Sequence, residues 1–305
     1  MYAPIVTFVY NREDHARELF ASLSACDLAR ESDLFIFSDG PKSEAGAAKV
    51  QAVRDYIHSA GLRDRFRSVT IVEAEHNKGL ASSVISGVDR VIQEYGRVIV
   101  IEDDNVVSRQ MLRFMNMGLD RYEQDTSVWC TSGYSSWDNV VGSEEDVFFS
   151  KRPNSYLWGT WKDRWDKVDW QVSDYRRFLF DFRRRRAFNK YGNDASGMLD
   201  DQMVGNIDSW AIRYYYSCFC HDGYVVMPNR TFSVNFGNDG SGTHLKKDGP
   251  RDERVMDDAP RDWKFPEPYE DERVIRAYNK RVHRKLTYRL FYYVKAGLLG
   301  MRNKR

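Results

Sequence analysis

The sequence predicts an α/β fold in which a mainly parallel sheet carries helices on both faces. Through the first 130 residues, short apolar runs rich in β-branched residues alternate with longer amphipathic stretches. The runs are apolar nearly throughout, which is typical of strands buried on both faces, and the amphipathic stretches have the pattern of surface helices. Strands of this kind separated by helices indicate a parallel sheet.

The expected elements follow one another in strict alternation. Strands are predicted at 5–9, 33–37, 69–72, 97–101 and 128–131, and helices at 13–28, 43–60, 80–94 and 109–123. From about Trp137 the composition changes, with five tryptophans between 158 and 210 and a basic stretch at 176–186. A helix is expected from Asp208 to about Cys220, and a short strand at 224–227. A glycine-rich segment at 235–244 looks too flexible for regular structure.

Polar side chains follow the first four predicted strands, at the point where each strand ends. They are Asn11-Arg12, Ser38-Asp39-Gly40, Asn77-Lys78-Gly79 and Glu102-Asp103-Asp104. Parallel sheets bind ligands beyond the carboxyl ends of their strands. We therefore expect the functional site at this edge of the sheet.

Charge and cysteine content exclude several classes of protein. Lys and Arg number 46 and Asp and Glu 45, so no overall field favours nucleic acid as a partner. The four cysteines, Cys26, Cys130, Cys218 and Cys220, lack zinc-site spacing and are expected to be buried thiols in a reducing compartment. The N-terminus enters the first strand directly, without a basic leader or a spanning apolar run, so a cytoplasmic location is expected.

The acidic triplet Glu102-Asp103-Asp104 is the most informative motif. It directly follows the apolar run 98–101, so its carboxylates are fixed at the ligand edge. Clustered carboxylates repel one another unless a cation offsets them, and Mn²⁺ or Mg²⁺ bridged to a diphosphate does so. The alternative is an acidic turn that stabilises the start of the next helix.

Two other segments at this edge suit a nucleotide. Asp39 is expected either to accept a hydrogen bond from a base or ribose, or simply to form a turn. Lys78, beside a glycine at a predicted helix start, can meet a phosphate with its charge and with nearby backbone N–H groups. Neither a P-loop nor a dinucleotide fingerprint is present in the sequence.

These motifs, in this order, resemble the Rossmann-like GT-A glycosyltransferases. The opening run through Tyr10-Asn11-Arg12 and the Asn77-Lys78-Gly79 stretch are similar to family 2, and Glu102-Asp103-Asp104 is similar to the N-acetylglucosaminyltransferase I group. The resemblance implies that Tyr10, Asn11, Arg12, Asp39, Lys78, Glu102 and Asp103 bind the donor and that Asp104 holds the metal. The segment Ile207-Asp208-Ser209-Trp210 resembles that group's W-D-D-W run, whose first aspartate is the catalytic base.

Bacterial transferases that build surface polysaccharides carry similar W-G-T-W and D-G-S-G-T-H segments, here 158–161 and 239–244. The resemblance thus covers residues 3–245. It implies a nucleotide-sugar-binding half at 1–130, an acceptor-binding and catalytic half at 131–262, and a basic amphipathic helix at 263–305. Ile207 and Ser209 depart from the W-D-D-W pattern and put the acceptor and donor in doubt more than the reaction.

Asp208 suits a general base independently of any family, because one carboxylate must take the proton of the attacking hydroxyl. Asp200 and Asp201 are the rival candidates. Ser241 and His244 lie in the loop expected to close over the donor, where His244 reaches either the metal or a phosphate, or is only a surface histidine. Trp158 and Trp161 are expected to wall the acceptor or donor, or to pack in the core.

The C-terminal stretch 274–305 holds ten Lys or Arg and no Asp or Glu, with apolar residues at helical spacing. It is expected either to lie on an anionic membrane surface or to dock on the catalytic domain.

The sequence therefore predicts an inverting, Mn²⁺- or Mg²⁺-dependent glycosyltransferase that uses a UDP-sugar and a glycan or lipid-linked acceptor in surface polysaccharide synthesis. Two alternatives stay open: a sugar nucleotidyltransferase, and a non-catalytic nucleotide- or carbohydrate-binding protein of the same fold. The nucleotidyltransferase needs a glycine-rich phosphate loop after the first strand, which this sequence lacks.

Overall fold

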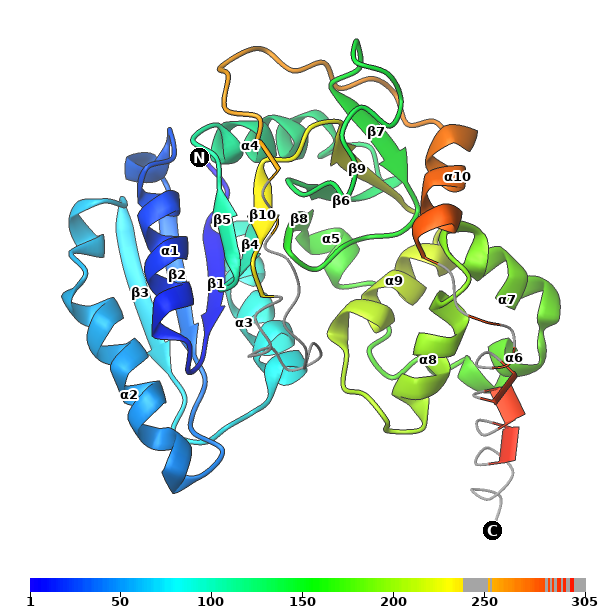
Figure 1. Cartoon of the computed structure of the whole chain (residues 1–305), viewed down its shortest axis with the longest axis horizontal. Coiled ribbons are helices and arrows are strands. Elements are labelled where there is room, and N and C mark those ends of the chain that lie inside the picture. Colours follow the sequence, from blue (N-terminus) through cyan, green and yellow to red (C-terminus); the bar gives the residue numbers. More distant parts are fainter. Residues whose placement is uncertain are drawn as a thin grey trace.

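An eight-stranded sheet forms the centre of the protein, in the order β3-β2-β1-β4-β8-β6-β9-β7 (Figure 1). The computed structural model describes residues 1–237, 252, 254–282, 285, 287, 290, 291, 293, 294, 297 and 298. Strands β3, β2, β1 and β4 are parallel to one another, whereas β8 and β7 run antiparallel to their neighbours. The expected α/β fold with a mainly parallel sheet and surrounding helices is confirmed.

The elements of the first half lie close to their predicted positions. The strands are β1 (Ile5–Val9), β2 (Asp33–Ser38), β3 (Ser68–Glu73), β4 (Arg97–Glu102), β5 (Asn105–Val107) and β6 (Val128–Ser132). The helices are α1 (Glu13–Ser24), α2 (Glu44–Ser59), α3 (Leu80–Tyr95) and α4 (Met111–Arg121). Helix α1 stops four residues earlier than predicted, and Leu28 then adopts a left-handed φ of 73° before a short 3₁₀ turn.

The second half adds strands to the same sheet and a group of helices beside it. The strands are β7 (Val147–Ser150), β8 (Leu157–Trp161), β9 (Tyr224–Pro228) and β10 (Ser233–Asn235). The helices are α5 (Lys162–Trp165), α6 (Tyr175–Phe180), α7 (Phe182–Phe188), α8 (Ala195–Met203), α9 (Trp210–Cys220) and α10 (Glu272–Arg281). The two predicted halves therefore share one sheet, because β8 inserts between β4 and β6.

Alternating side chains of the central strands feed two separate cores. Ile99 and Ile101 of β4 pack with α1, α2 and α4 on one face of the sheet. Val98 and Val100 pack with α3 and α9 on the other face. This period of two is what a strand buried on both faces requires. A third apolar cluster holds α6 to α9 together.

Three sequence predictions in the second half are wrong in their details. Asn235 was assigned to a flexible segment but ends β10, which pairs antiparallel with β5. Helix α9 begins at Trp210, not at Asp208, and the Ser209 side chain caps it by accepting from the Ile212 N–H. The C-terminal helix is not continuous, because α10 ends at Arg281.

Helix α10 is docked on the body of the protein. Its Val274, Ile275 and Tyr278 are buried in the second core. The docking alternative is therefore correct for this part of the C-terminal stretch. Of the four cysteines, three are buried as expected, and Cys220 is exposed. No helix among the described residues is long and apolar enough to cross a membrane.

An ion pair between the buried Asp33 and the exposed Arg67 fixes the start of β2. Asp33 pairs closely with Arg67 and also accepts hydrogen bonds from Ser68 Oγ at 2.6 Å and Tyr95 OH at 2.9 Å. Arg67, with support from Ser68 and Tyr95, lowers the pKa of Asp33 to about 2. The carboxylate therefore adds stability above its unfolded pKa of about 4, and this contribution is lost as the pH falls toward 2.

We predict that Asp33→Asn lowers the free energy of unfolding by about 2 kcal/mol at pH 7. The difference from wild type should shrink steadily between pH 5 and pH 2, because the wild-type carboxyl then takes up its proton. Urea unfolding across this range measures it. Asp120→Asn, which removes an exposed partner of Arg97, is the control and should cost less than about 1 kcal/mol. A pH-independent deficit in Asp33→Asn would contradict the electrostatic explanation.

Candidate active site

The acidic triplet lies at the carboxyl end of β4, next to the end of β1. Phe8 of β1 is in register with Glu102, which brings Arg12 alongside the two aspartates. The Arg12 guanidinium pairs closely with Asp103, and its Nη2 lies 3.5 Å from Asp104 Oδ2. The sequence therefore predicted correctly that residues after these two strands meet.

Among the described residues, the Arg12 guanidinium contacts the carboxylates of Asp103 and Asp104, and Glu102 lies beside them. Burial, with the charges of Asp104 and Asp103, raises the pKa of the Glu102 carboxyl well above its usual range. Burial also raises the pKa of Asp103, and the Arg12 charge only partly opposes this. A cation bound beside these carboxylates would offset the cost of burying them, since buried charge is costly until it is paired.

Asp104 is held from the opposite side by β10. Asn235 Nδ2 donates to Asp104 Oδ1 at 2.7 Å, and the Phe236 N–H donates to the Asp104 carbonyl at 3.0 Å. Gly237 lies so close that a Cβ added there would be 2.3 Å from Asp104 Oδ2. Glycine is thus needed at this position to give the carboxylate room.

The triplet fits a divalent cation shared with a diphosphate better than a cage made wholly of protein. Among the described residues, no three His, Cys, Asp or Glu side chains form a ready metal cluster. Mg²⁺-type sites with one or two carboxylates plus substrate phosphates need no such cluster. Asp104 is the residue that fits this role, because its side chain is 17% exposed against 9% for Asp103, and Arg12 contacts Asp103 more closely.

Asp39 ties the end of β2 to the start of α3. Its Oδ1 accepts from the Gly40 and Lys78 N–H groups at 2.9 and 2.8 Å. Its Oδ2 accepts from Asn77 Nδ2 and the Gly79 N–H, both at 3.0 Å. A carboxylate offers about four acceptor positions, and all four have a partner here. Asp39 thus forms the turn, and its predicted contact with a base or ribose stays a prediction.

The other predicted donor-binding residues surround this loop. The Lys78 side chain is exposed just before α3, which begins at Leu80 behind Gly79, whose φ is 80°. The Tyr10 hydroxyl accepts from the Lys42 N–H at 3.2 Å, and Asn11 is half-buried. These residues and the triplet occupy one edge of the sheet.

The three candidate bases differ sharply in their surroundings. Asp200 is buried in a two-pronged ion pair with Arg185 and accepts from Tyr175 OH at 3.0 Å. Asp201 is buried and accepts from Asn206 Nδ2 at 2.8 Å. By contrast, the Asp208 side chain is 63% exposed and pairs with Arg213 at 3.1 Å.

Asp208 lies one residue outside the cap of α9, so the helix does not hold it through its first N–H groups as expected from the sequence. Arg213 instead positions the carboxylate, because its Nε also donates to the Ser209 carbonyl at 3.1 Å. No hydrogen bond or ion pair between described residues joins Asp208 to the acidic triplet.

Both tryptophans of the W-G-T-W segment are in the core. Trp158 is 1% exposed and stacks between Trp165 and Trp210, and Trp161 donates its Nε1–H to the Leu119 carbonyl at 3.1 Å. The core-packing alternative thus describes them, rather than a wall open to a ligand. The predicted loop residues Ser241 and His244 lie outside the described residues.

Sequence reasoning did not single out the residues that β10 brings to the triplet. Asn235 and Gly237 contact Asp104, and His15 lies against Phe236 with ring centroids 4.7 Å apart. The only signal in the sequence for Asn235 and Gly237 is their place at the start of the glycine-rich segment. Pairing between β5 and β10 spans about 130 residues and leaves no local pattern.

Comparisons with known proteins identify a likeness of fold. No protein-family profile matches the sequence, and no curated protein matches it. The chain is similar to the Pyrobaculum calidifontis mannosyltransferase PcManGT, solved with GDP-Man and Mn²⁺, at a TM-score of 0.37 and 14% identity over 53% of this chain and 46% of that one. It is also similar to residues 1–349 of S. aureus TarS, at a TM-score of 0.45 and 11% identity over 76% and 60%.

A structure of S. aureus TarS of greater length gives a TM-score of 0.44 and 11% identity over 78% of this chain and 37% of that one. This chain thus spans less than two thirds of the length of each of these structures. At such identities and TM-scores the likeness concerns the path of the chain alone. What the protein does has to follow from its own side chains.

We predict that Gly237→Ala weakens Mn²⁺-dependent nucleotide binding about tenfold, because overpacking of about 1–3 kcal/mol would displace Asp104. Titration calorimetry with a nucleoside diphosphate, with and without Mn²⁺, measures the loss. Gly46→Ala in α2 is the matched control, since its new Cβ meets only Ser43 Oγ at 3.9 Å. Unchanged binding by Gly237→Ala would show that Asp104 is not held where the metal acts.

Proposed function

We propose that this protein is an inverting, divalent-metal-dependent glycosyltransferase of the GT-A type. Its donor would be a nucleotide-sugar, and a UDP-sugar is the first candidate. Its acceptor would be a glycan or a lipid-linked sugar in bacterial surface polysaccharide synthesis. The observation that carries the proposal is the cluster of three adjacent carboxylates, with Asp104 placed between Arg12 and Asn235 at the ligand edge of a parallel sheet.

The nucleotide half of the site is assigned to the edge formed by β1, β2 and β4. Asp39 keeps the Asn77–Gly79 loop folded, so that Lys78 stands ready at the start of α3 to meet a phosphate. Asp104 is assigned as the metal ligand. A divalent cation, when bound, offsets the negative charge that a departing nucleoside diphosphate acquires.

Asp208 is assigned as the general base. In the transfer, an acceptor hydroxyl oxygen forms the new bond to the anomeric carbon as the bond to the diphosphate breaks, and the electron pair leaves with the diphosphate. The hydroxyl proton goes to the Asp208 carboxylate. Asp208 favours this role over its rivals because its side chain is exposed, whereas the Asp200 carboxylate is enclosed by Arg185 and Tyr175.

The proposal is tested by release of nucleoside diphosphate. The protein is incubated with UDP-, GDP-, dTDP- and CMP-sugars, with Mn²⁺ or with a chelator, and the released nucleotide is measured. We expect one donor to release its nucleotide only when metal is present. Release of pyrophosphate from a nucleoside triphosphate and a sugar phosphate would instead identify a nucleotidyltransferase. Binding of nucleotide without any turnover, on a broad panel of acceptors, would identify a non-catalytic protein.

Asp104→Asn should abolish the Mn²⁺-dependent part of nucleotide binding and leave the fold intact, because the amide keeps the shape of the carboxylate and loses its charge. Thermal shift with nucleotide, with and without Mn²⁺, reports this directly, since a ligand that binds only the folded state raises Tm. Asp262→Asn, at an exposed partner of Arg113, is the control. Nucleotide affinity within about twofold of wild type in Asp104→Asn would refute the assignment.

Asp208→Asn should retain donor affinity and lose on the order of 10²–10⁴ in turnover, as expected for removal of a general base. Asp201→Asn should lose much less. Asp200→Asn should instead lower stability by about 3–5 kcal/mol, because it leaves Arg185 buried without its charged partner. Rates and urea unfolding measured on all three variants separate these effects. A dead Asp201→Asn beside an active Asp208→Asn would move the base upstream.

A further inference from the structure

Exposed apolar side chains are concentrated in two segments that the sugar-transfer site does not use. Nine large apolar residues among those described are exposed, and six of them belong to two parts of the chain. One part is α6–α7, and the other is the set of described residues between 285 and 298, named here the C-terminal segment. The six residues are Phe180, Phe182, Leu290, Phe291, Val294 and Leu298. Clusters of this kind mark interaction surfaces, whereas scattered single residues do not.

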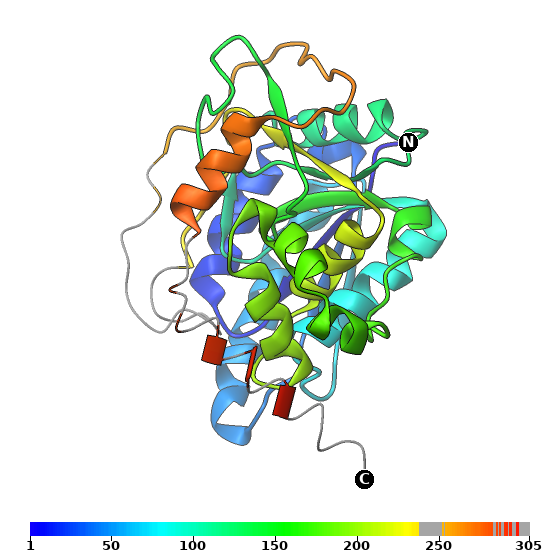
Figure 2. The same ribbon diagram turned by 90° about the vertical axis from the view of Figure 1, so that its right-hand side faces the viewer.

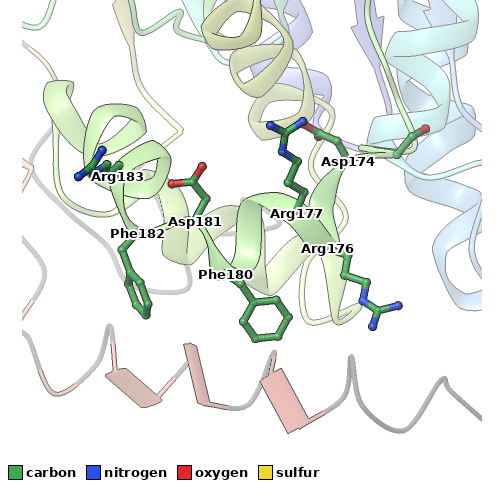
Figure 3. A pocket seen from close by; sticks show the side chains of 8 residues that line it. Asp174, Arg176, Arg177, Phe180, Asp181, Phe182 and Arg183 are labelled. Carbon is green, nitrogen blue, oxygen red and sulfur yellow. The ribbon is translucent and has the colours of Figure 1, made fainter.

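The two segments lie against each other. Tyr293 contacts Phe182 with ring centroids 5.6 Å apart, and the Arg185 guanidinium lies 5.1 Å from the centre of the same tyrosine ring. Phe180 and Phe182 project in the same direction, toward the described part of the C-terminal segment (Figure 3). The segment is thus held at α7 through Tyr293, while Leu290, Phe291, Val294 and Leu298 remain exposed.

This apolar surface carries positive charge without matching acids. Arg176, Arg177 and Arg183 line the pocket beside Phe180 and Phe182, and their side chains form no ion pair with any described residue. The two acidic residues of the same pocket are already engaged. Asp174 pairs with Arg184, and Asp181 caps α7 by accepting from the Arg184 N–H at 2.9 Å.

We infer that α6–α7 and the C-terminal segment together form a docking face for an anionic lipid bilayer. Exposed aromatic and aliphatic side chains beside unpaired basic residues are the combination that binds the interfacial region of such a bilayer. The face includes α6–α7, which the C-terminal basic composition alone does not reveal.

The docking face and the sugar-transfer site are open toward the same side of the molecule. The described parts of the C-terminal segment lie at the lower side in both views (Figures 1 and 2), and the carboxyl end of β1 points toward that side in Figure 1. A bilayer bound to the face would therefore lie on the side to which the ligand edge of the sheet points. That the protein uses this arrangement to reach a lipid-linked acceptor rests on the proposed function. The binding of lipid by the docking face does not depend on that function.

The test is co-sedimentation of the full chain with vesicles, in the absence of donor and acceptor. Vesicles of phosphatidylglycerol and phosphatidylcholine in equal parts are compared with vesicles of phosphatidylcholine alone. We expect binding only to the anionic vesicles, and weaker binding as salt rises. Because this assay involves no sugar transfer, a failure to bind vesicles would not affect the proposed enzymatic function. A failure of the enzymatic assay would likewise not affect the proposed lipid binding.

Two variants of α6 decide whether this element takes part. Arg176→Glu with Arg177→Glu should reduce partitioning onto anionic vesicles about tenfold or more, because the surface then repels the lipid. Phe180→Ser should reduce it at every salt concentration, since its contribution is apolar. Arg63→Glu with Arg65→Glu, the same charge change at exposed arginines before β3, is the matched control and should bind like wild type.

Truncation after residue 282 should also reduce vesicle binding while α10 stays docked through its buried residues. The proposal is overturned if the α6 variants bind as wild type does, or if neutral vesicles bind equally well. It is also overturned if the wild-type protein does not bind anionic vesicles but is a dimer by sedimentation velocity, and Phe180→Ser converts this dimer to a monomer. In that case the face joins two copies of the chain.

Discussion

The arrangement of the site depends on how buried carboxylates at the end of β4 are compensated. Burial raises the pKa of both Glu102 and Asp103, which shows that their charges are costly in this position. Arg12 offsets part of that cost from the end of β1, and Asn235 steadies Asp104 from β10. These contacts bring the ends of β1 and β4 and the strand β10 to one point, and in the proposed function a divalent cation would be held there.

The residues of the proposed site differ in how firmly they are held. Asp39 uses all four acceptor positions to fix the loop before α3, so the exposed Lys78 side chain is presented from a loop that is itself fixed. Asp208, by contrast, is exposed and held by one arginine. In the proposed transfer, the fixed edge would hold the nucleotide, and the exposed Asp208 would stay open to the acceptor.

The docking face formed by α6–α7 and the C-terminal segment would orient the protein on a bilayer. Its apolar residues are exposed. The described part of the C-terminal segment lies on the side toward which the carboxyl end of β1 points (Figure 1). Tyr293 shows how docking and lipid binding are compatible, since it holds the segment against Phe182 while neighbouring apolar residues stay exposed. Of the two expectations for the C-terminal stretch, docking applies to α10, whereas Leu290, Phe291, Val294 and Leu298 are exposed.

The sequence by itself determined the α/β class, the first four strands and the polar residues that end them. Strand and helix patterns are local, and the carboxyl ends of neighbouring parallel strands must meet at one edge, so Arg12 and the acidic triplet could be brought together without a structure. Only the tertiary structure decided that Trp158 and Trp161 are core residues, that Asp200 is enclosed by Arg185, and that Asn235 and Gly237 hold Asp104. These outcomes depend on contacts between segments far apart in the chain. Local composition carries no record of such contacts, because the same residue types are compatible with either a buried or an exposed position.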